Sequence, residues 1–274
     1  MIHCLGLSVY KNRINRINRI NRIHPPIESI TMKNAFFETL KTPFLGPEGA
    51  TVRKRSFRSV MLYAMAYPFS TGIVIYAGLM TFSMVLTNIT GFLPQIAKDL
   101  YEGQLNTAGS IFLWLFAFFL GGFFAGWCSE REKLLKSRYL HLLPLLTVML
   151  IYSGIGLSGQ KTENLHPVAF PSMILFTIGI LNAMVSLTTS SLIKASQMTG
   201  IVVELGVDVA ELFHSEGEKH LLIRREAWLR IVVMCSFIGG AMMSVALFPT
   251  IGTKVFYIPS AIVAGVMLYD VWRF

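Results

Sequence analysis

Long apolar stretches, each about as long as a membrane-spanning helix, follow one another from residue 59 onward. A helix needs about 20 mainly apolar residues to cross the hydrocarbon core of a bilayer. Two further segments, 83–101 and 192–212, are only half apolar and carry charges; each contains a Thr-Gly pair, and we call them the Thr-Gly segments. The six predicted spans are 59–80, 109–128, 139–158, 168–190, 230–248 and 254–272.

The basic residues of the loops predict how the Thr-Gly segments run. Cytoplasmic loops of membrane proteins are enriched in Lys and Arg. If both segments crossed the membrane, the loop 129–138, with four Lys and Arg, would lie outside. If both are broken or re-entrant, the loops 129–138 and 213–229 lie on the same side as a cytoplasmic N-terminus. We therefore predict broken or re-entrant segments, which are tolerated only inside protein or along a water-filled cavity.

The two halves of the chain resemble each other. Asn88–Glu102 aligns without gaps on Gln197–Glu211, with identical Thr, Gly, Asp and Glu at four positions. Further on, 119–126 resembles 237–244. Three full spans per half is an odd number, so the second half is predicted to be inverted, a design that recurs in transporters. The predicted fold is all-α: a polytopic membrane helix bundle of two inverted three-span repeats, 59–158 and 168–272.

Composition agrees with a membrane protein. Of the 274 residues, 53% are apolar and only 14% are charged, whereas a soluble domain carries about 25% charged residues. Three cysteines cannot build a disulfide framework. The sequence contains no His/Cys spacing typical of zinc, and no P-loop, GxSxG or HExxH motif. We therefore predict no metal, no cofactor and no enzymatic activity.

The net charge of +9 belongs almost entirely to an N-terminal tail. Residues 1–58 hold eleven of the 24 Lys and Arg, and three of the 15 acids. Such a tail could bind nucleic acid, but its place before the first span favours a cytoplasmic anchor, and we predict no nucleic-acid partner. Asn-Arg-Ile repeats four times over 12–23, and Met32 offers another start, so 1–31 are predicted to be disordered or not translated.

Matched acids in the two Thr-Gly segments are the candidate ion- or proton-binding residues. Glu204, Asp208 and Glu211 are spaced i, i+4 and i+7 on one helical face, and Asp99 and Glu102 match the last two in the first half. Ionisable side chains at bilayer depth are costly and mark ion or proton pathways. The alternative is that each segment ends in an amphipathic helix whose acidic face meets water.

The Thr-Gly pairs and neighbouring polar residues are candidates for a helix break beside a central cavity. A Thr before a short helix can cap its free N–H groups, and a helix N-terminus attracts anions; the alternative is a broken helix packed tightly without a ligand. A nearby Lys either pairs with an acid or anion or extends to the interface, and Asn side chains hydrogen-bond across helices. These candidates are Thr90, Gly91, Thr199, Gly200, Asn88, Asn182 and Lys194.

Small residues four apart predict where helices approach closely. Gly122-x-x-x-Gly126 and Gly240-x-x-x-Ser244 are two such patterns. They favour close packing within the fold and are also compatible with a homodimer. The other predicted partners are the lipid bilayer and a small solute of unknown identity.

Several of these residues resemble those of a known family. Gly179–Ala183, then Gln197–Gly200 and Glu204–Gly206, resemble the YoaK-like family of bacterial integral membrane proteins, a domain of unknown function. The resemblance covers about 58–272 and implies a multi-pass protein of the bacterial inner (cytoplasmic) membrane. The chain departs from the family at Phe92, where Asn is expected, and in the first span, where an Asp-Ala pair is expected.

The matched acids and the inverted topology favour a secondary transporter or permease for a small solute, coupled to protons or cations. Asp99 and Asp208 would be its ion sites. The alternative is a non-transporting membrane protein that assembles with or regulates a partner, which the two departures from the family favour. A membrane enzyme comes third, because no nucleophile–base or metal constellation is visible.

Overall fold

A computed structural model describes residues 57–82, 85–86, 89–135, 139–158, 166–188 and 195–273. These ranges are almost entirely helical and contain no strand, which confirms the predicted all-α polytopic bundle. The predictions for residues 1–56, Asn88 and Lys194 lie outside the described residues. The elements are α3 (Phe57–Phe82), α4 (Ile89–Tyr101), α5 (Leu105–Leu135), α6 (Leu142–Leu157), α7 (Ala169–Thr188), α8 (Met198–Leu212), α9 (Gly217–Ile251), the 3-10 helix η2 (Gly252–Phe256) and α10 (Tyr257–Arg273).

Each of the six predicted spans lies on a helix. Four helical stretches are long and apolar enough to cross a membrane, and the last of them contains α9, η2 and α10. α6 is equally apolar but has only 16 residues. α5 has 31 residues and α9 has 35, so at about 1.5 Å per residue both exceed a hydrocarbon core of about 30 Å. The four stretches are Val60–Phe82, Leu105–Leu135, Ala169–Leu187 and Lys219–Trp272.

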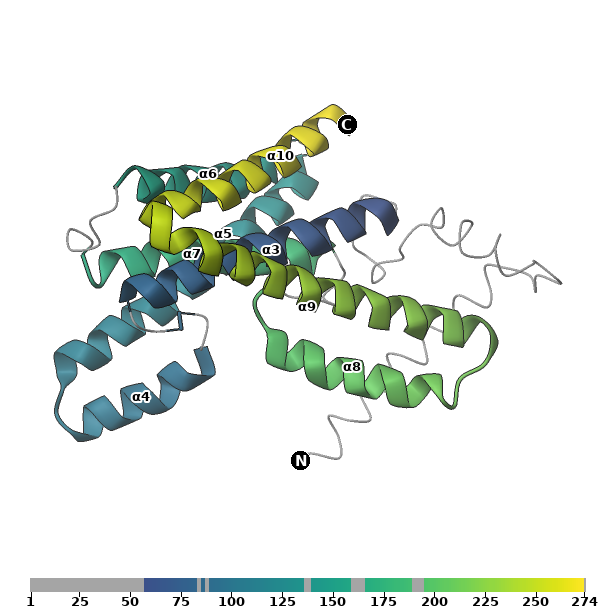
Figure 1. The fold of residues 1–274 in the computed structure, drawn as a ribbon, viewed down its shortest axis with the longest axis horizontal. Coiled ribbons are helices and arrows are strands. Elements are labelled where there is room, and N and C mark those ends of the chain that lie inside the picture. Colours follow the sequence, from purple (N-terminus) through teal and green to yellow (C-terminus); the bar gives the residue numbers. More distant parts are fainter. Residues whose placement is uncertain are drawn as a thin grey trace.

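The Thr-Gly segments form short helices that fold back on the long ones. α4 packs on the beginning of α5 and α8 on the beginning of α9, and the two hairpins lie at opposite ends of the bundle (Figure 1). Gly103, at φ +74°, ends α4, and the Gln104 N–H donates to the Asp99 carbonyl at 2.7 Å, as in a Schellman motif. With 13 and 15 residues, neither helix crosses a membrane; the re-entrant path stays a prediction.

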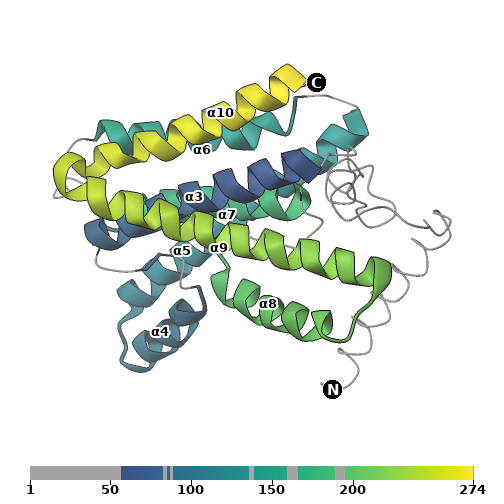
Figure 2. The same cartoon turned by 45° about the vertical axis from the view of Figure 1, so that its right-hand side comes forward.

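Two pairs of parallel helices form the centre of the bundle. α3 packs along α9, α5 packs along α7, and the two pairs run in opposite directions (Figure 2). In the first pair, a Cβ on Gly72 would clash with the backbone carbonyl of Phe237, and a Cβ on Gly240 would clash with that of Phe69. Because glycine has no Cβ, the two backbones can touch. The close approach predicted at Gly240 is therefore confirmed.

The second pair repeats this contact. A Cβ on Gly121 would clash with the carbonyl of Phe176, and a Cβ on Gly179 with that of Phe118. The close approach predicted at Gly126 is wrong, because nothing lies within 4 Å of a Cβ there. All four contacts use a Phe-x-x-Gly sequence: 69–72, 118–121, 176–179 and 237–240.

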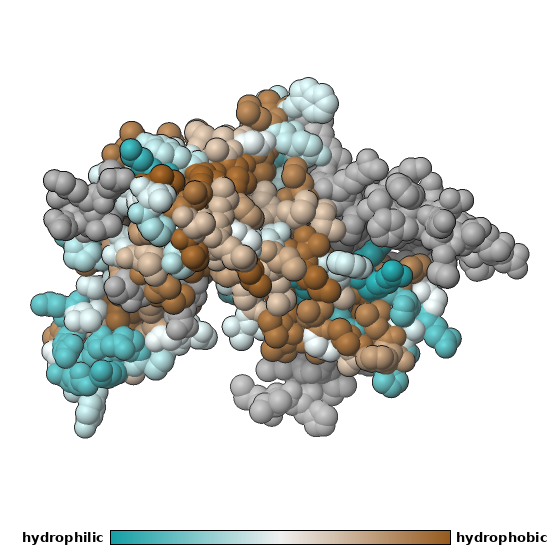
Figure 3. All heavy atoms as spheres, in the orientation of Figure 1, coloured by the Kyte–Doolittle hydropathy of each residue, from teal (hydrophilic) through white to brown (hydrophobic). Residues whose placement is uncertain are grey.

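The outer surface is largely apolar. Hydrophobic residues cover the middle of the face shown in Figure 3, while hydrophilic residues gather over α4 and near the beginning of α9. Large side chains on α5, such as Phe112 and Phe123, are exposed. A soluble monomer rarely exposes so extensive an apolar surface, whereas a lipid-facing helix does.

The bundle has two distinct ends. Glu132 near the end of α5, His141 before α6, and Asp270 near the end of α10 come together at one end, where α9 also begins (Figure 1). We call it the basic end, because most described Lys and Arg side chains lie there. The other end, with α4, η2 and the beginnings of α5 and α7, is called the α4 end. The last part of α5 and the first half of α9 carry Arg131, Lys133, Lys219, Arg224, Arg225 and Arg230, whereas α4 and η2 carry Lys98 and Lys254.

Candidate functional site

Asp99 is a buried carboxylate in the last turn of α4, with only 1% of the residue exposed. The Gln95 side chain donates a hydrogen bond to Asp99 Oδ1 at 2.7 Å, whereas Oδ2 has no hydrogen-bond partner among the described residues. The nearby Lys98 lies 3.9 Å from Glu102. A helix C-terminus disfavours negative charge. Asp99 therefore has a free oxygen at which a proton or a small cation could bind.

Asp208, the counterpart of Asp99, is equally buried but is paired. Its carboxylate contacts the guanidinium of Arg230 from α9, and Arg230 is itself only 4% exposed. Arg230 also donates to Glu204, through Nε at 3.1 Å and Nη2 at 3.0 Å, and lies 3.9 Å from Glu226. Asp99 and Asp208 are thus equally buried, but only Asp208 is paired with an arginine.

The tight helix crossings explain this difference. Gly121 and Gly240 make the same contact in the two central pairs, so α5 and α9 correspond at an offset of 119 residues (240 − 121). The likeness of 119–126 to 237–244 in the sequence gave an offset of 118. At the offset of 119 residues, the position of Arg230 corresponds to Ile111, which is buried. Asp99 therefore faces an apolar α5, without the arginine of the second half.

The two remaining acids lie near the hairpin turns and meet solvent. The side chain of Glu102 is 40% exposed and lies 3.9 Å from Lys98, and that of Glu211 is 29% exposed and lies 3.9 Å from Lys219. Both belong to weak, exposed ion pairs. Their positions agree with the alternative of an acidic helix face that meets water.

The Thr-Gly pairs lie in the first turns of α4 and α8. α8 begins at Met198, so Thr199 is its second residue and the capping role expected for Thr199 is wrong. The N-cap is Gln197, whose side chain makes no capping bond. Nothing lies within 4 Å of a Cβ built on Gly200. Thr90 and Gly91 are the second and third residues of α4. Both helices begin toward the middle of the bundle and run outward to its ends (Figures 1 and 2).

Asn182 fixes the segment that enters α8. Its Nδ2 donates to Ser196 Oγ at 2.7 Å, and its Oδ1 accepts the Ser196 backbone N–H at 2.9 Å. Asn182 is 6% exposed. This residue therefore ties α7 to the beginning of α8, and both polar ends of its amide have partners.

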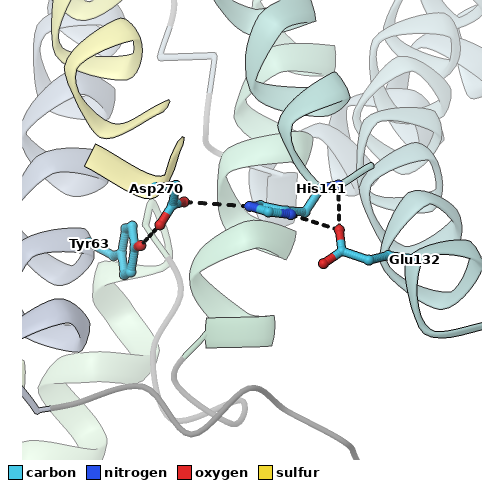
Figure 4. A network of polar contacts seen from close by, with 4 residues as sticks. All are labelled: Tyr63, Glu132, His141 and Asp270. Carbon is cyan, nitrogen blue, oxygen red and sulfur yellow. Dashed lines mark hydrogen bonds and ion pairs between the residues drawn. The ribbon is translucent and has the colours of Figure 1, made fainter. Parts of the chain in front are cut away.

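A second polar cluster, which the sequence analysis missed, lies at the basic end. His141 Nδ1 is 2.7 Å from Glu132 Oε2, and the His141 backbone N–H donates to the same oxygen at 2.6 Å. On the other side of the ring, His141 Nε2 lies 3.8 Å from Asp270 Oδ2. The Tyr63 hydroxyl donates to Asp270 Oδ1, so the chain of contacts joins α3, α10, the residue before α6 and α5 (Figure 4).

One signal for this cluster was present in the sequence. Asp270 is an acid inside a predicted span, and such residues usually mark functional sites. Its partners could not be read from the sequence, because Tyr63 and His141 come from distant segments. Among the described residues, no three His, Cys, Asp or Glu side chains are arranged to hold a metal ion.

Apolar helices of membrane-spanning length with buried charged clusters between them define a polytopic helical membrane protein. Residues 63–269 of the 274 match the family described as "Protein of unknown function (DUF1275)", and the chain belongs to that family. No curated protein and no solved structure matches the chain. The family supplies no activity, so the function must be argued from the site.

Proposed function

We propose that the protein is a secondary transporter or permease for a small solute in the bacterial inner membrane, coupled to a proton or cation at Asp99. The observation that carries the proposal is the buried carboxylate oxygen of Asp99, which has no hydrogen-bond partner among the described residues. A buried, uncompensated carboxylate is costly, and in a membrane helix bundle such a group typically belongs to an ion or proton pathway. We also retain the YoaK-like assignment within the family as part of this proposal.

The arrangement of the helices supports an inverted repeat. We infer that α3–α6 and α7–α10 are the two repeats, because α3 pairs with α9 as α7 pairs with α5, through the same Phe-x-x-Gly contact. The two pairs run in opposite directions, and the α4 and α8 hairpins lie at opposite ends (Figure 1). Transporters built on inverted repeats alternate access by moving one repeat against the other.

The polarity of α8 supports a re-entrant hairpin. Its buried Asp208 faces Arg230 of α9, while Val202, Val203 and Val207 on the opposite side are exposed. A helix at a water interface would show the reverse pattern. We therefore infer that the outer face of α8 meets lipid and that the Asp208–Arg230 pair is shielded between the two helices, while Glu204, whose side chain is 53% exposed, lies at the edge of the pair.

The two acidic positions have different roles in this proposal. Arg230 neutralises Asp208 and Glu204, so this cluster holds the second hairpin together. Coupling is then carried by Asp99 alone. We infer from its basic residues that the basic end faces the cytoplasm, with the N-terminus on that side and Asp99 toward the opposite face. No catalytic step is proposed.

A non-transporting assembly or regulatory protein is the second candidate. The Arg230 cluster favours it, because it closes one of the two matched acidic sites with internal ion pairs. In such a protein Asp99 would be structural, and no solute would bind.

A thermal-shift screen of the purified full chain tests the proposal. We would measure Tm against a panel of metabolites and ions at several values between about pH 5 and pH 8, for wild type and Asp99→Asn. A ligand that binds only the folded protein raises Tm by mass action. We expect at least one solute to raise Tm in wild type in a pH-dependent way, and the pH dependence to disappear in Asp99→Asn.

Glu102→Gln is the matched control, because it removes an exposed acid of the same helix. It should behave as wild type. If no member of the panel raises Tm, and the pH profiles of wild type and Asp99→Asn coincide, the transporter proposal fails. The assembly or regulatory role would then stand in its place.

A further inference from the structure

The His141 cluster has a polar group on each side of one imidazole ring. Glu132 Oε2 lies 2.7 Å from Nδ1, and Asp270 Oδ2 lies 3.8 Å from Nε2. His141 and Asp270 are 8% and 3% exposed. Nε2 has no hydrogen-bond partner among the described residues. The cluster is separate from Asp99, which lies at the α4 end.

The protonation states available to these groups differ in how many contacts they satisfy. A neutral imidazole carries one N–H, whereas an imidazolium carries two, and a carboxylate only accepts. With a neutral ring, the His141 nitrogen without hydrogen would face a carboxylate oxygen, lone pair against lone pair. One additional proton allows the ring to donate toward both Glu132 and Asp270.

No other cation in the described structure compensates these two carboxylates. The nearest basic side chains of α5 are engaged elsewhere: Arg131 lies over the Trp127 ring at 5.1 Å, and Lys133 lies 2.6 Å from Glu130. From α3, Tyr63 contributes a hydroxyl that donates to Asp270, and its ring stacks on Tyr67. From the segment of His141 itself, Tyr139 is exposed. Within the part of the chain that the structure describes, a proton on the ring is therefore the positive charge that these two carboxylates can share.

We propose that Glu132, His141 and Asp270 form a proton-binding site that closes the basic end of the bundle. With the proton bound, the ring bridges α5 to α10, and Tyr63 extends the bridge to α3. Without the proton, the half-buried carboxylate of Glu132 and the buried carboxylate of Asp270 face a neutral ring, and the bridge to Asp270 loses its attraction. The closed end is thus favoured at low pH and weakened as pH rises. This inference does not depend on the transport of any solute.

The protonation state of His141 is the direct test. We would label the histidine rings with 15N and record spectra of the full chain in lipid nanodiscs at about pH 7.5, where an unperturbed histidine is neutral. We expect one imidazolium signal, missing in His141→Gln and retained in His214→Gln, since His214 is an exposed histidine of the α8–α9 turn. In Asp270→Asn the signal should change to that of a neutral ring.

A neutral His141 in wild type would overturn the proposal, and so would an imidazolium signal that persists in Asp270→Asn. Closure is tested separately by a distance between spin labels at positions 134 and 272, which are both highly exposed. The distance distribution should broaden as pH rises above about 7.5, once the ring loses its proton, in wild type and not change in His141→Gln. A solute-free protein suffices for both measurements, so a failed transport assay leaves their outcome interpretable.

Discussion

Four glycines set how closely the central helices approach. Gly72, Gly121, Gly179 and Gly240 each lie against the backbone carbonyl of a phenylalanine on the partner helix. In a bilayer, helix association depends on close packing rather than on the hydrophobic effect. A side chain at any of these positions would meet backbone, which cannot rotate away as a flexible side chain can.

Gly240→Ala should therefore destabilise the protein. The added methyl group would clash with the Phe69 carbonyl, and overpacking of this kind typically costs about 1–3 kcal/mol. Gly126→Ala is the control, because its Cβ would meet nothing within 4 Å and alanine is the better helix former by roughly 0.5–1 kcal/mol. Thermal unfolding in detergent should show a lower Tm for the first variant and an equal or higher Tm for the second. Equal stabilities would contradict the crossing described here.

The α8–α9 hairpin holds a buried ion pair between its two helices. Asp208 and Arg230 face each other between the helices, and apolar side chains such as Val203 point outward. A buried ion pair does little for net stability, yet removing one partner leaves an uncompensated charge. The cluster thus specifies which faces of the two helices meet.

Arg230→Met should destabilise the hairpin by about 3–5 kcal/mol, since Asp208 would remain buried without its cation. The double variant Arg230→Met/Asp208→Leu should recover most of that loss, because apolar side chains can replace a buried pair. Lys219→Met, which touches only an exposed pair with Glu211 at 3.9 Å, should change stability by less than about 1 kcal/mol. Denaturant titrations would measure all three variants, and a double variant no more stable than the single one would refute the ion-pair argument.

At the scale of the whole molecule, the two hairpins and the two ends define a topology. The α4–α5 turn lies at the α4 end, and the α8–α9 turn lies at the basic end (Figure 1). Glu130 belongs to the last turns of α5. If the repeats are inverted, these two turns face opposite sides of the membrane. In the proposed topology, the excess of basic residues favours the cytoplasm for the side that carries the α8–α9 turn.

Single cysteines would test this topology, in a chain whose three native cysteines are replaced by serine. An impermeant maleimide should label Gln104→Cys in intact cells. Ser215→Cys and Glu130→Cys should react only after permeabilisation. Labelling of positions 104 and 130 from the same side would rule out the inverted repeat.

Much of the fold follows from the sequence because the bilayer imposes a strong length rule. An apolar segment of about 20 residues in a membrane protein usually forms a helix, because a helix satisfies the backbone hydrogen bonds within the segment. All six predicted segments carry helices. The Thr-Gly segments also stood out, since charge interrupts their hydrophobicity. Where α8 begins could not be read in the same way: the helix starts at Met198, so Thr199 lies inside it.

The sequence by itself determined the helical membrane class, the matched acids and the asymmetry of charge, because all three depend on local composition and on spacing along one helix. Only the tertiary structure decided which acids are compensated. Asp99 and Asp208 look alike in the sequence, and the difference lies in Arg230, which a separate helix supplies. The His141 cluster needs Tyr63 and Asp270 brought together across 207 positions of the chain. Such contacts depend on how the helices cross, and no local pattern encodes a crossing.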